Sequence, residues 1–148
     1  MKSTPTLTRR NGPKLKGIYA LEIWLNQDIW LIVGALGELC FKKGKYFYVG
    51  SAQNSLENRV KRHLRKEKKN FWHIDYLLTS DAALVTKVLL REAGKEYECK
   101  LAEELNRLGK PVAKFGCSDC SCKSHLFNVV EDSEALQHFT QIFNLTQN

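Results

Sequence analysis

A short basic segment is the feature of this chain whose chemistry is plainest. Between residues 58 and 69 the sequence reads NRVKRHLRKEKK, with seven Lys or Arg residues and one acid, Glu67. The segment carries +6 of the net charge of +7, so the rest of the chain is nearly neutral. Such a cluster suits a polyanion, because each neutralised phosphate of a nucleic acid releases condensed counterions. A solvated helix face is the alternative interpretation of the same charge.

A cysteine-rich loop supplies a second kind of chemistry. Cys117, Cys120, Cys122 and His125 lie within nine residues, in the pattern C-x2-C-x-C-x2-H. Zinc accepts three thiolates and one imidazole in a tetrahedral site, so these four residues are candidate zinc ligands. Structural zinc sites usually draw on two separated ligand pairs, and a turn-rich loop with packed cysteines is the alternative.

The basic segment has the spacing of a helix over 54–69. Leu56, Val60 and Leu64 recur every four residues and form an apolar stripe that docks on a core. The positive side of this helix is then left to contact nucleic acid. The residues expected to do so, beside Arg59, are Lys61, Arg62, Arg65, Lys66 and Lys69.

The remaining elements alternate in type along the chain. Apolar, β-branched and aromatic runs predict strands, the first two of them paired as a hairpin, over 17–25, 29–33, 45–50, 82–90 and 125–130. Helical spacing predicts helices over 95–108 and from 132 or 133 to 143, and a short helix or buried turn over 70–78. We therefore expect an α+β fold in which a small, mainly antiparallel sheet of three to five strands is flanked by helices.

Length and composition bound the class of protein. The chain has 148 residues, of which 43% are hydrophobic and 26% charged, which suits one globular domain over 16–148 after a flexible basic arm over 1–15. Its apolar runs fall short of the roughly 18 residues that span a bilayer. The start lacks the apolar stretch of a signal peptide, so we expect a cytoplasmic location and, with five cysteines, reduced thiols.

Ordered short motifs resemble a known family of nucleases. The tripeptides GIY at 17–19 and YVG at 48–50 are followed by Arg59 and His63 on the next helix and by Glu98 on a later one, an order that resembles the GIY-YIG nuclease family. Two further stretches, FWHIDYL at 71–77 and FGCSDCSCKSHLF at 115–127, look like its compact prokaryotic subfamily DUF123.

The resemblance implies a phosphodiester-hydrolysing site built on one divalent metal. Glu98 would hold Mg²⁺ or Mn²⁺ through a single carboxylate, and Arg59 would contact the scissile phosphate. Tyr19 would position or deprotonate the attacking water, with Tyr48 in the same hydrogen-bond network. His63 would shuttle a proton or bind phosphate. Spacing alone leaves Glu98 as one of five glutamates, and its choice depends on the match of E-x-x-L to the family's acid helix.

The chain departs from the family pattern in two respects. The spacer between the two tripeptides is unusually long, so an added hairpin must fit between paired strands. The stretch 110–114 lacks the asparagine that the family commonly has after its metal-binding glutamate. His73 and Asp75 are candidate substitutes for this polar group, and Asp119 and His125 are candidates to face the same site.

Three classes of function follow from these observations. The leading hypothesis is a metal-dependent endonuclease that hydrolyses DNA, with Mg²⁺ or Mn²⁺ as cofactor. The alternative is a non-catalytic nucleic-acid-binding module on the same scaffold, which the missing asparagine favours. The third is a redox or zinc-sensing protein centred on 117–122. The choice of DNA or RNA, the substrate structure and the oligomeric state are left open by the sequence.

Overall fold

The central element of the fold is a six-stranded antiparallel sheet with the strand order β6-β7-β4-β1-β5-β8. The computed structural model describes residues 15–116, 122–129, 134–143 and 145–147. Three strands have nine residues each, namely β1 (Gly17–Leu25), β4 (Gly44–Ala52) and β5 (Ala83–Arg91). The shorter strands are β6 (Lys110–Pro111), β7 (Leu126–Val129) and β8 (Leu145–Gln147).

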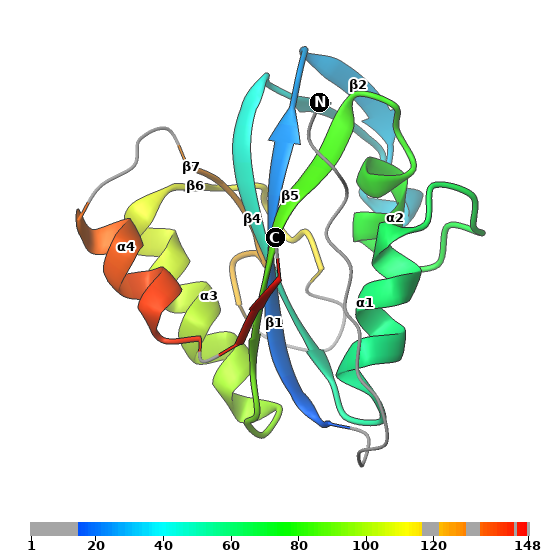
Figure 1. Ribbon diagram of the computed structural model, residues 1–148. Coiled ribbons are helices and arrows are strands. Elements are labelled where there is room, and N and C mark those ends of the chain that lie inside the picture. Colours follow the sequence, from blue (N-terminus) through cyan, green and yellow to red (C-terminus); the bar gives the residue numbers. More distant parts are fainter. Residues whose placement is uncertain (1–14, 117–121, 130–133, 144, 148) are drawn as a thin grey trace.

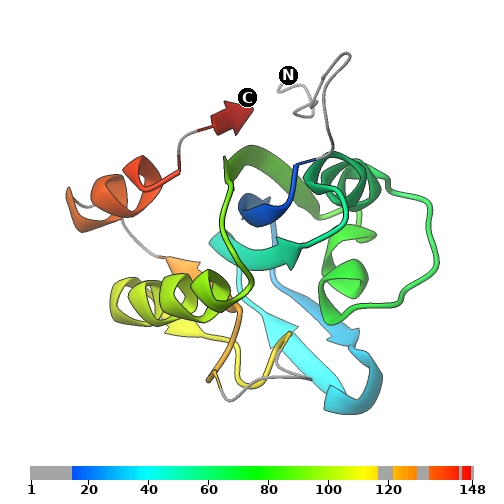
Figure 2. The same cartoon turned by 90° about the horizontal axis from the view of Figure 1, so that it is seen from below.

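Helices cover both faces of this sheet. On one face lie α1 (Leu56–Leu64) and α2 (His73–Leu78), and on the other lie α3 (Glu96–Leu108) and α4 (Glu134–Gln141), as Figures 1 and 2 show from two directions. The predicted α+β class, with a small antiparallel sheet flanked by helices, is confirmed. The two short edge strands β6 and β8 bring the number of strands to six.

Strand β1 lies in the middle of the sheet, between β4 and β5, and is buried on both faces. Its side chains alternate between the faces, so Tyr19, Leu21 and Ile23 join the core under α1 and α2. Ile18 and Ala20 join the separate core under α3 and α4. Because the strand serves two cores at once, its sequence is almost continuously apolar rather than alternating.

The predicted hairpin between the first two strands is wrong. Strand β2 (Ile29–Ile32) pairs instead with β3 (Glu38–Phe41) and forms a separate two-stranded sheet. Strand β1 has nine partners along β4 and a second full-length neighbour in β5, a pairing that the four-residue β2 cannot match. The short hairpin therefore projects from the end of β1 that is far from α1 (Figure 1).

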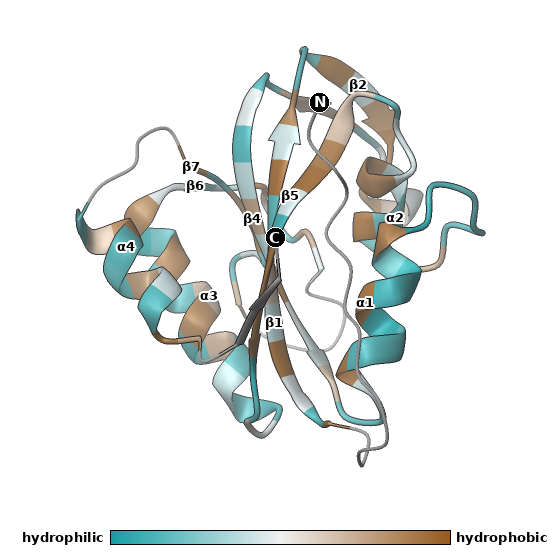
Figure 3. Ribbon diagram, in the orientation of Figure 1, coloured by the Kyte–Doolittle hydropathy of each residue, from teal (hydrophilic) through white to brown (hydrophobic). Residues whose placement is uncertain are grey.

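Helix α1 is shorter than predicted, since it ends at Leu64 rather than at residue 69. Its first turn is capped by Ser55, whose hydroxyl accepts a hydrogen bond from the Asn58 backbone N–H at 3.2 Å. Its last turn is closed by the Lys68 ammonium, which donates to the carbonyl oxygens of Arg62 and His63 at 2.9 Å each. The basic segment is thus half helix and half loop, and both halves are coloured hydrophilic in Figure 3.

The other predicted elements agree with the structure to within a few residues. The strand predicted over 82–90 is β5, the stretch 70–78 contains α2, and the helix predicted over 95–108 is α3. The later strand and helix correspond to β7 and α4. Across the described residues, no helix is both long enough and apolar enough to cross a membrane.

Candidate active site

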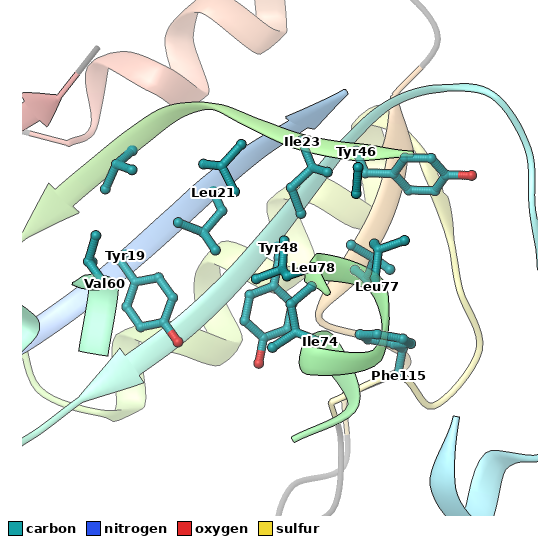
Figure 4. Packing of buried hydrophobic residues seen from close by; sticks show 14 of the residues in the cluster. Tyr19, Leu21, Ile23, Tyr46, Tyr48, Val60, Ile74, Leu77, Leu78 and Phe115 are labelled. Carbon is teal, nitrogen blue, oxygen red and sulfur yellow. The ribbon is translucent and has the colours of Figure 1, made fainter. Parts of the chain in front are cut away.

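Two tyrosines from neighbouring strands form the floor of a cleft at one end of the sheet. Tyr19 of β1 lies opposite Gly50 of β4, and Tyr48 lies opposite Leu21, so both rings point to the face covered by α1. Their ring centroids are 6.3 Å apart. Figure 4 shows both hydroxyls pointing to the same side of the apolar cluster. A Cβ atom at position 50 would collide with the Tyr19 hydroxyl, which explains the glycine there.

The cleft above these rings has a volume of about 300 Å³ and is lined mainly by polar groups. Its walls include Arg59 from α1 and Glu98 from α3, which packs on the other face of the sheet. Among the described residues, β7 pairs with β4 only from Lys45 to Tyr48 and no strand lies beside the end of β4 on that side, where Glu98 lines the cleft. His125 lies next to Glu98, with 3.8 Å between Nδ1 and Oε2.

His63 lies directly behind the tyrosines, where it is only 2% exposed. Its Nε2 is 2.7 Å from the Tyr19 hydroxyl, and its ring centroid is 6.1 Å from that of Tyr48. Burial, together with the nearby charge of Lys68, lowers the pKa of His63 to about 3, so the imidazole is neutral at physiological pH. Burial also raises the pKa of both tyrosines, so their hydroxyls stay protonated.

Arg59 is held at the cleft wall by two contacts. Its Nη1 donates to the Ser51 carbonyl oxygen at 2.9 Å, and its guanidinium carbon lies 4.3 Å from the centroid of the Trp72 ring. Arg62 approaches the same ring at 4.4 Å. A guanidinium that is stacked and hydrogen-bonded in this way is already oriented, which lowers the entropic cost of binding an anion.

Asp75 organises the loop that carries Trp72 and does not line the cleft. Its carboxylate is fully buried and accepts two hydrogen bonds from Arg62, at 2.9 and 2.8 Å. The backbone N–H groups of Phe71 and Trp72 donate to the same carboxylate at 2.8 and 2.9 Å. Burial raises the pKa of Asp75, but these donors outweigh it and hold the pKa below its usual range. Asp75 and Arg62 therefore form a structural ion pair, and in this structure neither is presented to a ligand in the cleft.

The expected nucleic-acid-binding residues divide into two groups. Arg62 is paired with Asp75, and the Lys66 ammonium donates to the carbonyl oxygens of Leu78 and Ser80 at 3.0 and 2.8 Å. These two cations serve the fold. The second group is Lys61, Arg65 and Lys69, which are exposed, as Lys66 also is. Lys61 pairs with Glu57 at 3.1 Å.

Of the further polar residues that the sequence predicted for this site, His73 and His125 differ in whether they line the cleft. The His73 Nδ1 accepts a hydrogen bond from the Gly116 backbone N–H at 2.9 Å, and its ring packs on Phe115, so it fixes a loop and does not line the cleft. His125 is a cleft residue. Asp119, like the candidate zinc ligands Cys117 and Cys120, lies outside the described residues.

Several cleft residues were missed by sequence reasoning. Ser51 at the end of β4 lines the cleft, as do Gln53 and Asn54 between β4 and α1, and Trp72 and Lys95. The first three directly follow the YVG tripeptide, so position next to a motif was an available signal. Trp72 lies in a run of apolar and aromatic residues that indicates burial, and Lys95 is one of many lysines, so neither could be singled out.

The donor set of the cleft fits a hard divalent cation. Glu98 is the single carboxylate among the described residues that line the cleft, and its side chain is 12% exposed. Mg²⁺ and Mn²⁺ prefer oxygen ligands, and Mg²⁺ often keeps several waters while binding one or two carboxylates. A cleft of about 300 Å³ has room for such waters beside Glu98.

The fold and site define an α+β domain with a polar cleft, lined by tyrosine, arginine and glutamate, at one end of its sheet. The chain belongs to the family described as a domain of unknown function, DUF123, whose model matches residues 18–148. No match was found among curated proteins or among solved structures. The DUF123 part of the resemblance is thereby confirmed, whereas the nuclease assignment stays a prediction.

Proposed function

We propose that this protein is a divalent-metal-dependent endonuclease that hydrolyses phosphodiester bonds of nucleic acid, with DNA as the first substrate to test. The observation that carries the proposal is that side chains from distant parts of the sequence meet in one cleft. Tyr19, Tyr48, Arg59 and Glu98, which are separated by up to 79 positions in the sequence, line one cleft. His63 joins them through its 2.7 Å contact with Tyr19. These are the five residues to which the GIY-YIG resemblance assigns roles.

The contact between Tyr19 and His63 supports a proton relay. The pKa of Tyr19 is raised by burial, so a phenolate is not the resting state of this residue. The Tyr19 hydroxyl instead accepts a proton from the attacking water while it donates its own to Nε2 of neutral His63. In this arrangement the His63 proton is on Nδ1, a buried atom without a hydrogen-bond partner among the described residues.

Substrate binding strengthens the relay. In the free protein the positive charges of Lys68 and Arg59 oppose protonation of His63. A bound phosphate brings negative charge next to Arg59 and offsets that opposition, so the basicity of His63 rises when a substrate is present. Arg59 meanwhile neutralises the charge that develops on the phosphate oxygens.

Glu98 and the polar rim supply the remaining requirements. Glu98 would hold the cation, and a bound Mg²⁺ or Mn²⁺ supplies Lewis-acid stabilisation of the departing oxygen. The Gln53 and Asn54 amides in the cleft wall are candidate hydrogen-bond partners for the substrate, at a site that lacks the family asparagine over 110–114. The exposed cations Lys61, Arg65 and Lys69 then attract the flanking phosphates.

The proposal is tested with the purified full-length chain and labelled single-stranded, duplex, flapped and branched DNAs, with RNA in parallel. Each reaction contains Mg²⁺, Mn²⁺ or EDTA. We expect metal-dependent cleavage that falls by roughly 10²–10³-fold in Glu98→Gln and in Arg59→Ala. The matched control is Glu103→Gln, which removes the same charge from an exposed position of α3 outside the cleft.

Two results would overturn the proposal. One is cleavage with Mg²⁺ that is as fast in Glu98→Gln as in the wild type. The other is tight, salt-sensitive binding without cleavage of any substrate, unchanged by EDTA and by Glu98→Gln. The second result would identify a nucleic-acid-binding module on the same scaffold.

A further inference from the structure

A second cluster of ionisable side chains shares His125 with the cleft and is assigned no step in the proposed hydrolysis. Cys99 of α3, Cys122 and His125 each direct one possible ligand atom to a common region, and these three atoms lie within 4.8 Å of one another. His125 is buried, and the two cysteines are half-buried. The rest of α3 and strand β6 separate Cys99 from the cysteine-rich loop, so only the fold brings the three side chains together.

We propose that Cys99, Cys122 and His125 form a zinc site that joins the start of α3 to the segment leading into β7. The proposal is independent of the nuclease function, because the cleft cation proposed above is a hard ion held by Glu98. Two thiolates and an imidazole are soft and borderline ligands, a set that favours zinc over Mg²⁺ or Mn²⁺. It also differs from the ligand set predicted from the sequence, which took all four ligands from 117–125 and omitted Cys99.

The distance between the two sulfur atoms must increase when zinc binds. The two sulfur atoms are 2.7 Å apart, which is longer than a disulfide bond of about 2.05 Å. Two thiolates bound at about 2.3 Å to one tetrahedral zinc lie roughly 3.7 Å apart, so zinc binding requires the sulfurs to separate by about one ångström. Small side-chain rotations of Cys99 and Cys122 supply such a movement.

The hydrogen bonding of His125 prepares it as a ligand. Its Nδ1 is 3.3 Å from the Val49 carbonyl oxygen and 3.8 Å from the Glu98 carboxylate. Both neighbours are acceptors, so they favour the tautomer with the proton on Nδ1, in which the lone pair that can bind a metal is on Nε2. A backbone carbonyl or carboxylate behind a histidine is the usual second layer of a zinc site, since it fixes the ring and raises its basicity.

A path from solvent and the place of Cys99 in α3 also support the zinc site. Cys122 lines a groove of about 250 Å³ along α3, together with Ala102 and Asn106, which offers an ion a path from solvent. Cys99 directly follows Glu98, so an ion bound to Cys99 would hold the first turn of α3, and with it Glu98, against His125. The consequence is a structural zinc that fixes the position of the cleft carboxylate.

The test uses the untagged full-length chain, purified with zinc and then stripped and refilled with Co²⁺. We expect about one zinc per chain and, in the cobalt form, thiolate-to-cobalt charge-transfer absorption with the visible bands of a tetrahedral site. Cys99→Ser and Cys122→Ser should each weaken zinc affinity by more than about 100-fold. The matched control is Cys40→Ser, a free cysteine on β3 in the separate small sheet, which should bind zinc as the wild type does.

A further variant separates ligand loss from misfolding. Cys99→His keeps a zinc ligand at this position, so it should retain cobalt binding with weaker sulfur charge-transfer absorption, even if Cys99→Ser does not fold. Full zinc content and an unchanged cobalt spectrum in Cys99→Ser would overturn the proposal and favour a site confined to the loop. A wild type that holds no zinc and carries a Cys99–Cys122 disulfide by non-reducing mass spectrometry would also overturn it.

Discussion

The buried ion pair between Asp75 and Arg62 makes a quantitative test of how the cleft wall is held. In Asp75→Asn the shape of the side chain is kept, but the carboxylate that accepts four hydrogen bonds is lost. Breaking a buried ion pair by removing one partner costs about 3–5 kcal/mol. The Arg62 side chain is 22% exposed and can be partly hydrated, so we expect about 3 kcal/mol, near the lower limit. For a chain of this size that loss lowers Tm by roughly 6–12 °C.

The assay is urea unfolding at pH 7, followed by circular dichroism, in a double-mutant cycle with Arg62→Met. If the ion pair is the cause, the double variant should be less destabilised than the sum of the single variants, by on the order of 1–3 kcal/mol. Additive losses, or a loss below about 1 kcal/mol in Asp75→Asn, would refute the reasoning, since water would then be solvating the carboxylate. Because the folded pKa of Asp75 is lowered, its contribution is present above pH 4 and is lost as the pH falls through that lowered pKa.

Three further predictions concern His63 and two lysines of the basic segment. The pKa of His63 is about 3 in the folded protein, so the unfolded chain binds a proton first and the free energy of unfolding falls as the pH drops below about 6.5. Between pH 8 and 4.5, urea unfolding should show a loss of stability that is roughly 2–3 kcal/mol larger in the wild type than in His63→Gln. Equal pH profiles for the two proteins would contradict this prediction. Lys66→Met should cost about 1–2 kcal/mol of stability by leaving backbone carbonyls unpaired, and should leave the salt dependence of nucleic-acid binding unchanged. Lys69→Met should leave stability unchanged and reduce the slope of log K for nucleic-acid binding against log salt by about 0.7–0.9. If Lys66→Met reduced this slope instead, Lys66 and not Lys69 would be the lysine that contacts phosphate.

Local sequence patterns predicted most of the helices and strands, whereas the choice of which strands pair depends on residues that are distant in the sequence. The run from Gly17 to Leu25 is apolar in sequence because both of its faces are buried, and that signal is local. The choice of β4 over β2 as its neighbour is not local, since it depends on which strand offers a matching length after an intervening hairpin. For the same reason β3 could not be found in a stretch broken by glycines.

In the candidate site, likewise, the sequence predicted some residues, whereas the contacts between side chains depended on the fold. Ordered motifs were enough to select Tyr19, Tyr48 and Arg59, which line the cleft. Charge, in contrast, could not show that Arg62 is paired with Asp75. The sequence of the basic segment does not distinguish a basic side chain that pairs within the fold from one that can bind a ligand. Cys99 was likewise invisible as a possible ligand, since it is a single cysteine 18 positions before the first cysteine of the loop.

The β2–β3 hairpin has a consequence for how this domain can diversify. The hairpin interrupts the chain between β1 and β4, yet the two strands keep an unbroken register from Gly17 opposite Ala52 to Leu25 opposite Gly44. Tyr19 and Tyr48 lie within that ladder, opposite Gly50 and Leu21, and four further pairs separate Tyr48 from the insertion, so the length and sequence of the insertion are decoupled from the spacing of the tyrosines. The connection between β1 and β4 is therefore a position at which one insertion can be exchanged for another, by evolution or by design, without a change in the spacing of the two tyrosines.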